Sequence, residues 1–418
     1  MRMLLSATAA IALVAGAPAL HAQDTSRLER LPVLKATNAA DNAAVPQTGP
    51  QAEAIREMLK RIRLPEGFRI ELYAVAPGAR YMAVGPATGV VFVGTRRGRV
   101  WAVTDRNHNF VADDVRPFAP GVEFNVANGV ALSSDGGLYV AELNRVLVFP
   151  AAEARYESAD IPAFSVVPQG KLIPPDEESQ NHGARVIKQG PDGKLYITLG
   201  QPYNVPPAGK LARYDETGIG GIIRLDSDGR NREVFARGAR NPAGIAFQAN
   251  GTLWWNDHQV DGMGDTIPPG ETNISTKVGQ HFGFPWYGGG RVRTADYKAS
   301  IPPADAVFPV LEHDAHAADM GAMFYTGKQF PEIYRGGYFW AQHGSWNRSD
   351  PIGARVMWVP VKDGKPAGKP TPFAEGWMNE AGKYLGRPVD VAQLDDGSML
   401  VSDDHAGAVY RVWYGAAK

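Results

Sequence analysis

From about residue 64 onward, one alternation of polar turns and apolar strands recurs along the chain. Each copy has a turn, most often Asp-Gly or Asn-Gly, followed by a short run of β-branched and aromatic residues. Six copies over about 350 residues correspond to roughly 55 to 60 residues per unit, which suits four-stranded propeller blades with some long loops. The four clear copies are residues 135–140, 192–197, 250–255 and 396–401, and two looser copies are 88–93 and 336–340.

Helical patterns are almost absent after residue 63. A doubly wound α/β fold would need helical crossovers between its strands. The pattern therefore predicts an all-β domain over residues 64–418, a six-bladed β-propeller of four-stranded antiparallel blades. A sandwich of stacked sheets is the alternative, and regular repetition favours radial closure over it.

The N-terminal part of the chain has a different pattern. Residues 1–22 begin Met-Arg-Met, continue with apolar and small residues and end at Ala22, as in a cleaved secretory signal peptide. The apolar stretch is short for a membrane span, so we expect a periplasmic or secreted protein without stable membrane insertion. Residues 23–63 form a leader: a flexible segment, then a short amphipathic helix over 51–63 with Ile55, Met58, Leu59 and Ile62 on one face.

Composition narrows the possible chemistry. The chain has no Cys, so it has neither disulfides nor a Cys-x-x-Cys-His site for haem c. The net charge is −1 and no basic stripe is present, which argues against nucleic acid as a partner. No sequence typical of nicotinamide binding, nucleotide hydrolysis or zinc proteases occurs.

Five loop sequences carry candidate chemistry. They are Asn-His-Gly-Ala-Arg at 181–185, Gly-Ala-Arg-Asn-Pro-Ala-Gly at 238–244, the acidic run 256–265, Gln-His-Gly-Ser-Trp-Asn-Arg at 342–348, and Gly-Arg-Pro-Val-Asp-Val at 386–391. In this order on a repeat scaffold, they resemble the soluble quinoprotein glucose and sorbosone dehydrogenases over residues 64–414. The motifs at 342–348 and 281–285 are more similar to the sorbosone-type branch.

The resemblance implies an enzyme that uses pyrroloquinoline quinone (PQQ) and Ca²⁺ to oxidise an aldose or a sugar aldehyde. Such enzymes transfer a hydride from the sugar carbon to the quinone while a base takes the hydroxyl proton. Because the chain cannot attach haem c, we expect the electrons to leave through a separate acceptor.

His182 matches the family's catalytic base. A neutral imidazole can accept a proton near pH 7, which suits it to this step. The alternative is an ordinary surface-loop histidine. The family usually has a second Gly where this chain has Ala184, and that difference would alter the loop if the position required a positive φ.

The cofactor residues follow from the same resemblance. Guanidinium groups pair well with the quinone carboxylates. Arg387 matches one of two expected arginines in the last blade, but Val389 stands where the other is expected, and His316 or Arg348 are candidates to replace it. Trp346 is expected to stack on the quinone or to line the substrate site, with a blade-core position as the alternative. The full set of expected cofactor residues is Asn128, Asn181, Arg240, Asn241, His258, His316, His343, Trp346, Arg348 and Arg387.

The acidic run 256–265 stands where the family has its calcium-binding loop. Calcium prefers several hard oxygen ligands, which carbonyl groups and Asp side chains supply. We expect Gln259 and Val260 to contribute carbonyls and Asp257, Asp261 and Asp265 to ligate directly or to support the ligands. An acidic, solvated loop is the alternative.

Two other functions stay open at this stage. A central metal beside a histidine also activates water, as in a calcium-dependent propeller hydrolase acting on lactones or phosphoesters. A non-catalytic propeller could bind a ligand on the same face. Carboxylate recognition is the discriminating feature, because a quinone with three carboxylates demands convergent Arg or Lys side chains and a hydrolase does not.

Overall fold

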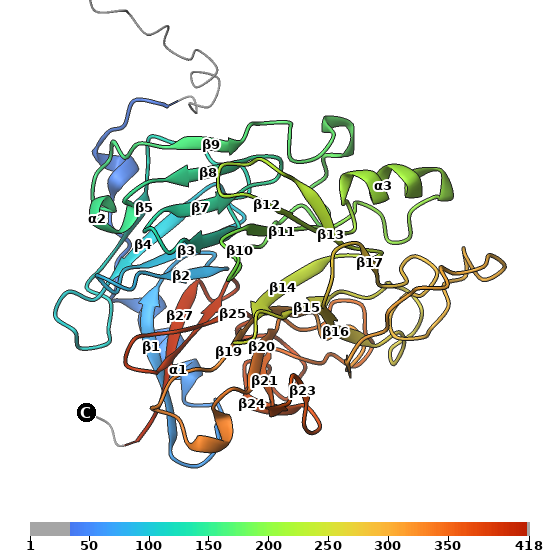
Figure 1. Ribbon diagram of the computed structural model, residues 1–418. Coiled ribbons are helices and arrows are strands. Elements are labelled where there is room, and N and C mark those ends of the chain that lie inside the picture. Colours follow the sequence, from blue (N-terminus) through green and yellow to red (C-terminus); the bar gives the residue numbers. More distant parts are fainter. Residues whose placement is uncertain (1–33, 416–418) are drawn as a thin grey trace, which may run out of the picture.

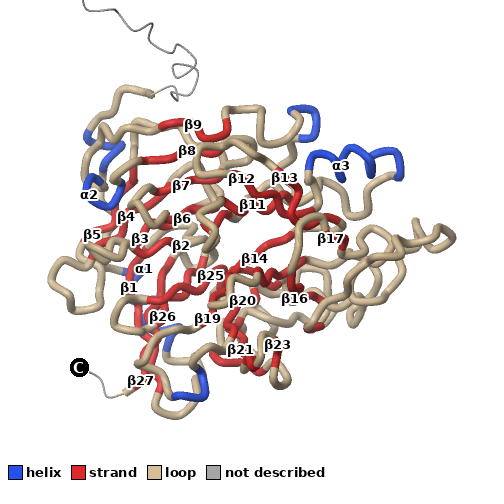
Figure 2. The backbone as a smooth tube through the Cα atoms, viewed as in Figure 1, coloured by secondary structure: helices blue, strands red, loops and turns tan. Residues whose placement is uncertain are grey.

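The computed structural model describes residues 34–415. The expected signal peptide at residues 1–22 therefore lies outside the described residues. Strands dominate the described part, and its helices are short (Figures 1 and 2). None of these helices is long and apolar enough to span a bilayer. The α-helices are α1 (Pro50–Leu59), α2 (Ala152–Arg155) and α3 (Leu211–Thr217), and the 3-10 helices are η2 (Ala39–Asn42), η3 (Pro175–Glu177), η4 (Ala208–Lys210) and η5 (Glu332–Tyr334).

Six antiparallel four-stranded sheets form the blades of a propeller. Blade 1 contains β2 (Met82–Val84), β3 (Val91–Gly94), β4 (Val100–Thr104) and β5 (Asp114–Phe118), and blade 2 contains β6 (Gly129–Leu132), β7 (Leu138–Ala141), β8 (Val146–Phe149) and β9 (Phe164–Val167). Blade 3 contains β10 (Ile187–Gln189), β11 (Leu195–Leu199), β12 (Gly221–Leu225) and β13 (Glu233–Arg237), and blade 4 contains β14 (Pro242–Phe247), β15 (Leu253–Asp257), β16 (Gly270–Ser275) and β18 (Leu311–His313). Blade 5 contains β19 (Asp319–Phe324), β20 (Tyr338–Gln342), β21 (Arg355–Val359) and β24 (Thr371–Glu375), and blade 6 contains β25 (Pro388–Gln393), β26 (Met399–Asp403), β27 (Ala408–Tyr414) and β1 (Phe68–Val75).

Three further strands lie outside this pattern. The short strand β17 (Gln280–His281) pairs in parallel with β13 and extends blade 3 by one strand. A small hairpin of β22 (Val361–Lys362) and β23 (Lys365–Pro366) projects between β21 and β24.

The six turn-and-strand repeats of the sequence each form the second strand of a blade. These strands are β3, β7, β11, β15, β20 and β26. Every residue in all six is buried, on both faces of the sheet, because each blade packs between its two neighbours. The predicted all-β fold with six blades is confirmed.

The first strands of the blades close a ring. β2 contacts β6, and the series continues through β10, β14, β19 and β25 back to β2. Space between neighbouring first strands is small: a side chain at Gly244 in β14 would collide with the Met320 carbonyl, and one at Gly321 in β19 with Asp390. Glycine at these positions allows the backbones to approach closely enough for closure. The sandwich alternative is excluded by this ring.

Blade 6 is built from both ends of the described chain. Its outer strand β1 runs antiparallel to β27, from Phe68 opposite Tyr414 to Val75 opposite Ala408. The N-terminal strand therefore fastens the last blade to the first. A large apolar cluster lies behind this junction and includes Phe68, Tyr410 and Trp377.

The segment before β1 is more closely attached than predicted. α1 begins at Pro50 and ends at Leu59, four residues before the predicted end at residue 63, and its apolar face joins the cluster behind blade 6. Val45 donates its backbone N–H to the Val115 carbonyl at 2.8 Å, and the Gln47 side chain exchanges hydrogen bonds with the backbone of Val75. Residues 34–49 thus lie against the propeller, where a flexible leader was expected.

Candidate active site

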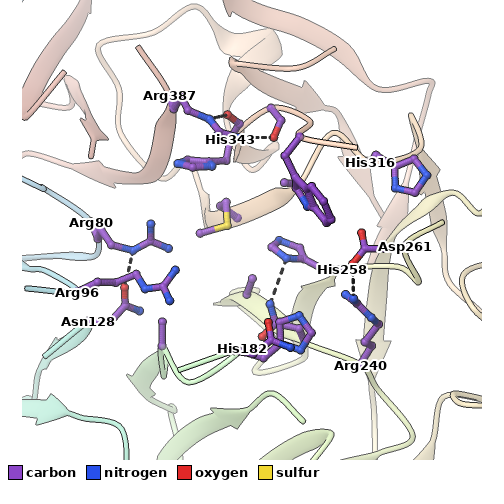
Figure 3. A pocket seen from close by; sticks show the side chains of 18 of the residues that line it. Arg80, Arg96, Asn128, His182, Arg240, His258, Asp261, His316, His343 and Arg387 are labelled. Atoms are coloured by element: carbon purple, nitrogen blue, oxygen red, sulfur yellow. Dashed lines mark hydrogen bonds and ion pairs between the residues drawn. The ribbon is translucent and has the colours of Figure 1, made fainter. Parts of the chain in front are cut away.

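A cavity of about 400 Å³ lies at one end of the central ring (Figure 3). Each blade contributes a residue that precedes its first strand: Arg80, Asn128, His182, Arg240, His316 and Arg387. The turns after second strands contribute Arg96, His258, Gln259, Asp261, His343, Trp346 and Asn347. In an antiparallel blade, the start of the first strand and the end of the second lie at the same edge, so these loops converge. A volume of this size is within the usual range for a small-molecule site.

His182 occupies a constrained position in this cavity. Its φ of 54° lies in the left-handed region, which is uncommon for a residue other than glycine. The buried Arg185 donates to the His182 carbonyl at 3.1 Å and to the Leu143 carbonyl at 3.0 Å, which fixes the loop. Ala184, the departure from the family pattern, is not among the positive-φ residues of the described range, so a second glycine is unnecessary there.

The ring of His182 has one nitrogen engaged and one free for a ligand. Its Nδ1 lies 2.6 Å from the Gln201 carbonyl oxygen. Since a carbonyl only accepts, Nδ1 must carry the proton, and Nε2 of the neutral ring has a free lone pair. Burial, and next the positive charge of Arg240, lower the pKa of His182 to about 3. The side chain is therefore neutral and able to accept a proton at ordinary pH.

The other cavity histidines have partners that restrict their roles. His258 lies between the Asn241 side chain, at 3.1 Å from Nδ1, and the Asp319 carbonyl, at 2.8 Å from Nε2. Burial lowers the pKa of His258 to about 4. His343 uses Nε2 to contact Asp404 at 2.8 Å. His258 therefore has both ring nitrogens engaged, whereas His343 is held at Nε2 by a carboxylate and differs from His182, which is held at Nδ1 by a carbonyl.

His316 orients the side-chain amides of Gln259 and Asn347. Its Nδ1 accepts hydrogen bonds from Gln259 Nε2 at 3.0 Å and from Asn347 Nδ2 at 3.1 Å. The Nε2 of His316 lies 2.8 Å from the Gly264 carbonyl oxygen. The amide oxygens of Gln259 and Asn347 are buried and have no hydrogen-bond partner. Buried polar atoms are normally satisfied, so these two oxygens mark a place where a ligand group or a cation is expected.

Four guanidinium groups reach the cavity, from Arg80, Arg96, Arg240 and Arg387. Arg240 forms an ion pair with Asp261 at 2.6 Å, and Arg80 forms one with Asp404. Arg387 donates to the carbonyls of His343 and Gly344, at 2.8 and 2.6 Å. The lining therefore carries a surplus of positive charge, which favours an anionic ligand.

The acidic run 256–265 divides between the cavity and other places. Gln259 and Asp261 line the cavity, and Asp261 also accepts from Asn347 at 2.7 Å. Asp257 instead accepts the backbone N–H groups of Arg240 and Asn241, at 2.9 and 2.7 Å, and so fixes the loop that carries them. Within residues 34–415, no group of three or more His, Asp or Glu side chains could hold a metal ion between them.

Besides Asp257, three predicted residues of the site are not among those that line the cavity. Arg348 donates to the carbonyls of Asp350 and Ala315, at 2.9 and 3.1 Å. Asp265 accepts from Ser349 at the surface. Val260 is buried and bonds the Gly288 carbonyl through its backbone N–H. The structure therefore does not bring Arg348 to the cavity lining, and its role at the cofactor stays a prediction.

The remaining predicted cofactor residues do line the cavity, namely Asn128, Asn181, Asn241 and Trp346. Trp346 is 76% exposed, so it stands at the mouth and is not a blade-core residue. Sequence reasoning missed Arg80, Arg96, Gln180 and Asn347. Asn347 lies in the motif 342–348 beside the chosen residues, but neither Arg80 nor Arg96 lies in any recognised motif.

Comparisons with known proteins give a similar family, similar relatives and a similar fold. The family model for Glucose / Sorbosone dehydrogenase matches residues 163–343. Over these residues the chain is similar to that family. The matched residues include the His182 loop, the Arg240 loop and the acidic run, and the match supports an oxidoreductase that acts on sugars.

Relatives extend the likeness over the rest of the propeller. An uncharacterized protein of Borreliella burgdorferi is 26% identical over 370 residues, which cover 86% of this chain and 93% of that protein. The aldose sugar dehydrogenase YliI of Escherichia coli is 31% identical over 175 residues, 38% of this chain and 44% of that enzyme. The holo PQQ domain of pyranose dehydrogenase from Coprinopsis cinerea has the same fold, with a TM-score of 0.67, 17% identity, and coverage of 84% of this chain and 97% of that domain.

Proposed function

We propose that the chain is a PQQ-dependent dehydrogenase that oxidises an aldose or a sugar aldehyde. One observation carries the proposal: a neutral histidine with a free ring nitrogen faces a cavity into which four guanidinium groups converge. PQQ bears three carboxylates, and binding them requires such a surplus of positive charge. The PQQ domain of the Coprinopsis cinerea neighbour supports this choice of cofactor.

The residues present fit the quinone. Arg240 and Arg387 lie on different blades, so they can hold carboxylates at separated points of one planar molecule. Arg240 is 4% exposed, which makes a charge-assisted hydrogen bond there stronger than one at the surface. Asn241 and His258, which bond each other, provide further polar contacts beside His182.

The calcium site is part of the same proposal. No group of three or more His, Asp or Glu side chains in residues 34–415 could hold a metal ion, so a calcium ion would depend on carbonyl and amide oxygens together with Asp261. The carbonyls of Gln259 and Val260 and the unpartnered amide oxygens of Gln259 and Asn347 are candidates. Hard, neutral oxygens of this kind are ligands that calcium accepts.

In the proposed reaction, His182 Nε2 takes the hydroxyl proton of the aldose or of the hydrated sugar aldehyde, while Nδ1–H remains bonded to the Gln201 carbonyl. The bound quinone would supply the oxidising carbon that accepts the hydride, and a calcium ion would polarise the quinone oxygen. Arg185 holds the His182 carbonyl and so keeps Nε2 in place during the transfer. The exposed Trp346 offers a flat apolar surface for the sugar at the cavity mouth.

Three further parts of the proposal rest on sequence. The motifs at 281–285 and 342–348 favour a sorbosone-like substrate within the sugar class. The pattern of residues 1–22 favours a periplasmic or secreted location. The absence of Cys, and hence of attached haem c, favours a separate electron acceptor such as a soluble cytochrome or a quinone-linked protein.

Reconstitution tests the proposal directly. Purified protein freed of cofactor is titrated with PQQ in the presence of calcium, and quinone binding is followed by absorbance. Oxidation of a panel of aldoses and sugar aldehydes is then measured with a dye acceptor. We expect saturable quinone binding and dye reduction that depends on both PQQ and sugar. Absence of quinone binding together with absence of activity over the panel would overturn the proposal.

A further inference from the structure

The last blade lacks one carboxylate-binding arginine that the family resemblance leads us to expect. Val389 occupies its position in β25 and is 0% exposed. Its side chain packs in an apolar cluster with Tyr81 and Met320, so no ligand contact is available to it. Of the two replacements expected from sequence, Arg348 is not among the residues that line the cavity, and both ring nitrogens of His316 are occupied.

Blade 1 supplies two guanidinium groups on the same side of the cavity (Figure 3). Arg80 precedes β2 and is 6% exposed, and Arg96 lies in the turn between β3 and β4. Partial desolvation and then the positive charge of Arg80 lower the pKa of Arg96. The two side chains therefore share one local region of positive potential.

Arg80 is firmly positioned. Its Nε donates to Asn128 Oδ1 at 2.6 Å, and its NH1 pairs with Asp404. Asn128 in turn donates to the Arg185 carbonyl at 2.8 Å. Asp404 also contacts His343 at 2.8 Å. Although burial opposes it, the bonds from His343 and Arg80 keep the pKa of Asp404 below its ordinary value, so Asp404 stays charged and Arg80 stays paired.

Arg96 is differently placed. Its NH2 donates to the Gln180 carbonyl at 3.1 Å, two residues before His182. Among the ion pairs of the described chain, none involves Arg96. A carbonyl orients a guanidinium without neutralising it, so Arg96 keeps a full charge and further N–H donors for a ligand.

We propose that Arg96, with Arg80 beside it, forms a carboxylate-binding subsite that takes the place of the arginine missing at position 389. This inference rests on the proposed function. A planar guanidinium binds a carboxylate through two parallel hydrogen bonds, and a second positive charge nearby strengthens that contact. The carboxylate comes either from the quinone or from an acidic sugar whose hydroxyl lies at His182, and the test separates these sources.

The test compares Arg96→Gln with two matched variants. Arg97→Gln removes the same charge from the next position of the same turn, outside the cavity lining. Arg348→Gln removes the arginine that sequence favoured. PQQ affinity is measured by absorbance titration without substrate, and thermal unfolding establishes that each variant folds. We expect Arg96→Gln to weaken PQQ binding about 10- to 100-fold, while both other variants bind as the wild type does.

The second arm identifies the source of the carboxylate. KM is measured for a neutral aldose and for the corresponding sugar acid at saturating PQQ. If Arg96→Gln leaves quinone affinity unchanged but raises KM for the sugar acid alone, the subsite binds the substrate. If Arg96→Gln matches Arg97→Gln in quinone affinity and in both KM values, the inference is overturned while the proposed function stands. If the wild type itself binds no PQQ, the proposed function fails and the inference fails with it.

Discussion

The strongest prediction concerns the free nitrogen of His182. In His182→Gln the side chain keeps a similar reach but has no basic atom. The Gln201 carbonyl holds Nδ1 at 2.6 Å and the loop is fixed by Arg185, so the wild-type base is already positioned and no reorganisation is needed before proton transfer. A positioned base contributes about 10²- to 10⁴-fold, which corresponds to about 2.7 to 5.4 kcal/mol of activation free energy.

The assay separates proton transfer from cofactor binding. Turnover of the quinone-loaded variant is measured with a dye acceptor, and quinone affinity is measured independently by absorbance titration. We expect turnover to fall by the stated factor and quinone affinity to change little. His258→Gln is the matched control, because His258 also lines the cavity but both its nitrogens are engaged by Asn241 and Asp319. This control should affect quinone affinity or KM more than kcat.

The pH dependence gives an independent check. His182 accepts a proton only when neutral, so its contribution is present above its pKa of about 3 and is lost as the pH falls through that value. kcat/KM of the wild type should therefore show no acid limb from this residue between pH 5 and 8. If His182→Gln, loaded with quinone, retains near-native turnover, or if His258→Gln loses as much, the assignment of the base is refuted.

Two other perturbations test the remaining parts of the site, and a third tests Glu271, a buried carboxylate in β16 of blade 4. Arg240→Ala should weaken quinone binding by roughly 1.5 to 3 kcal/mol in an absorbance titration, with turnover at saturating quinone much less affected; unchanged affinity would remove Arg240 from the cofactor site. Chelation of calcium should weaken quinone binding and abolish dye reduction together, and magnesium should restore little because it prefers a tighter octahedral shell; turnover that survives chelation contradicts the calcium proposal. Burial, and then the charge of Asp257, raise the pKa of Glu271 to about 8, so its contribution to stability is complete below about pH 4.5 and declines as the pH rises towards 8. The melting temperature of the wild type should accordingly fall relative to that of Glu271→Gln as the pH rises from 5 to 8. A difference between the two melting temperatures that stays constant over this range would contradict the raised pKa.

The fold could be predicted from the sequence because each blade repeats the same local pattern of residues. A Gly-containing turn followed by a doubly buried strand occurs once per blade, and each occurrence proved to be a second strand. The attachment of residues 34–49 was not predictable in this way, because it depends on single contacts such as Gln47 with Val75 that leave no periodic pattern.

The site residues could be predicted mainly where they lie in recognisable motifs. His182, Arg240 and Arg387 belong to such motifs and line the cavity. Arg96 stands in an Arg-Arg-Gly turn that is typical of a solvated hairpin, and only ring closure brings it to the other five blades. Arg348 shows the opposite case: it lies in a recognised motif, one position beyond Asn347, but it is not among the residues that line the cavity.

The pairing of β1 with β27 joins segments more than 300 residues apart in the sequence. The chain therefore cannot complete its last blade until its C-terminal strand is available, and until then β1 presents an unpaired strand edge. Contacts between residues so distant in sequence form slowly during folding. During that time the incomplete ring is exposed to aggregation or proteolysis. A circular permutant that begins after β1 and carries β1 directly behind β27 would make blade 6 contiguous. Such a rearranged chain should fold faster with the same cavity, since none of the residues that line it would change position.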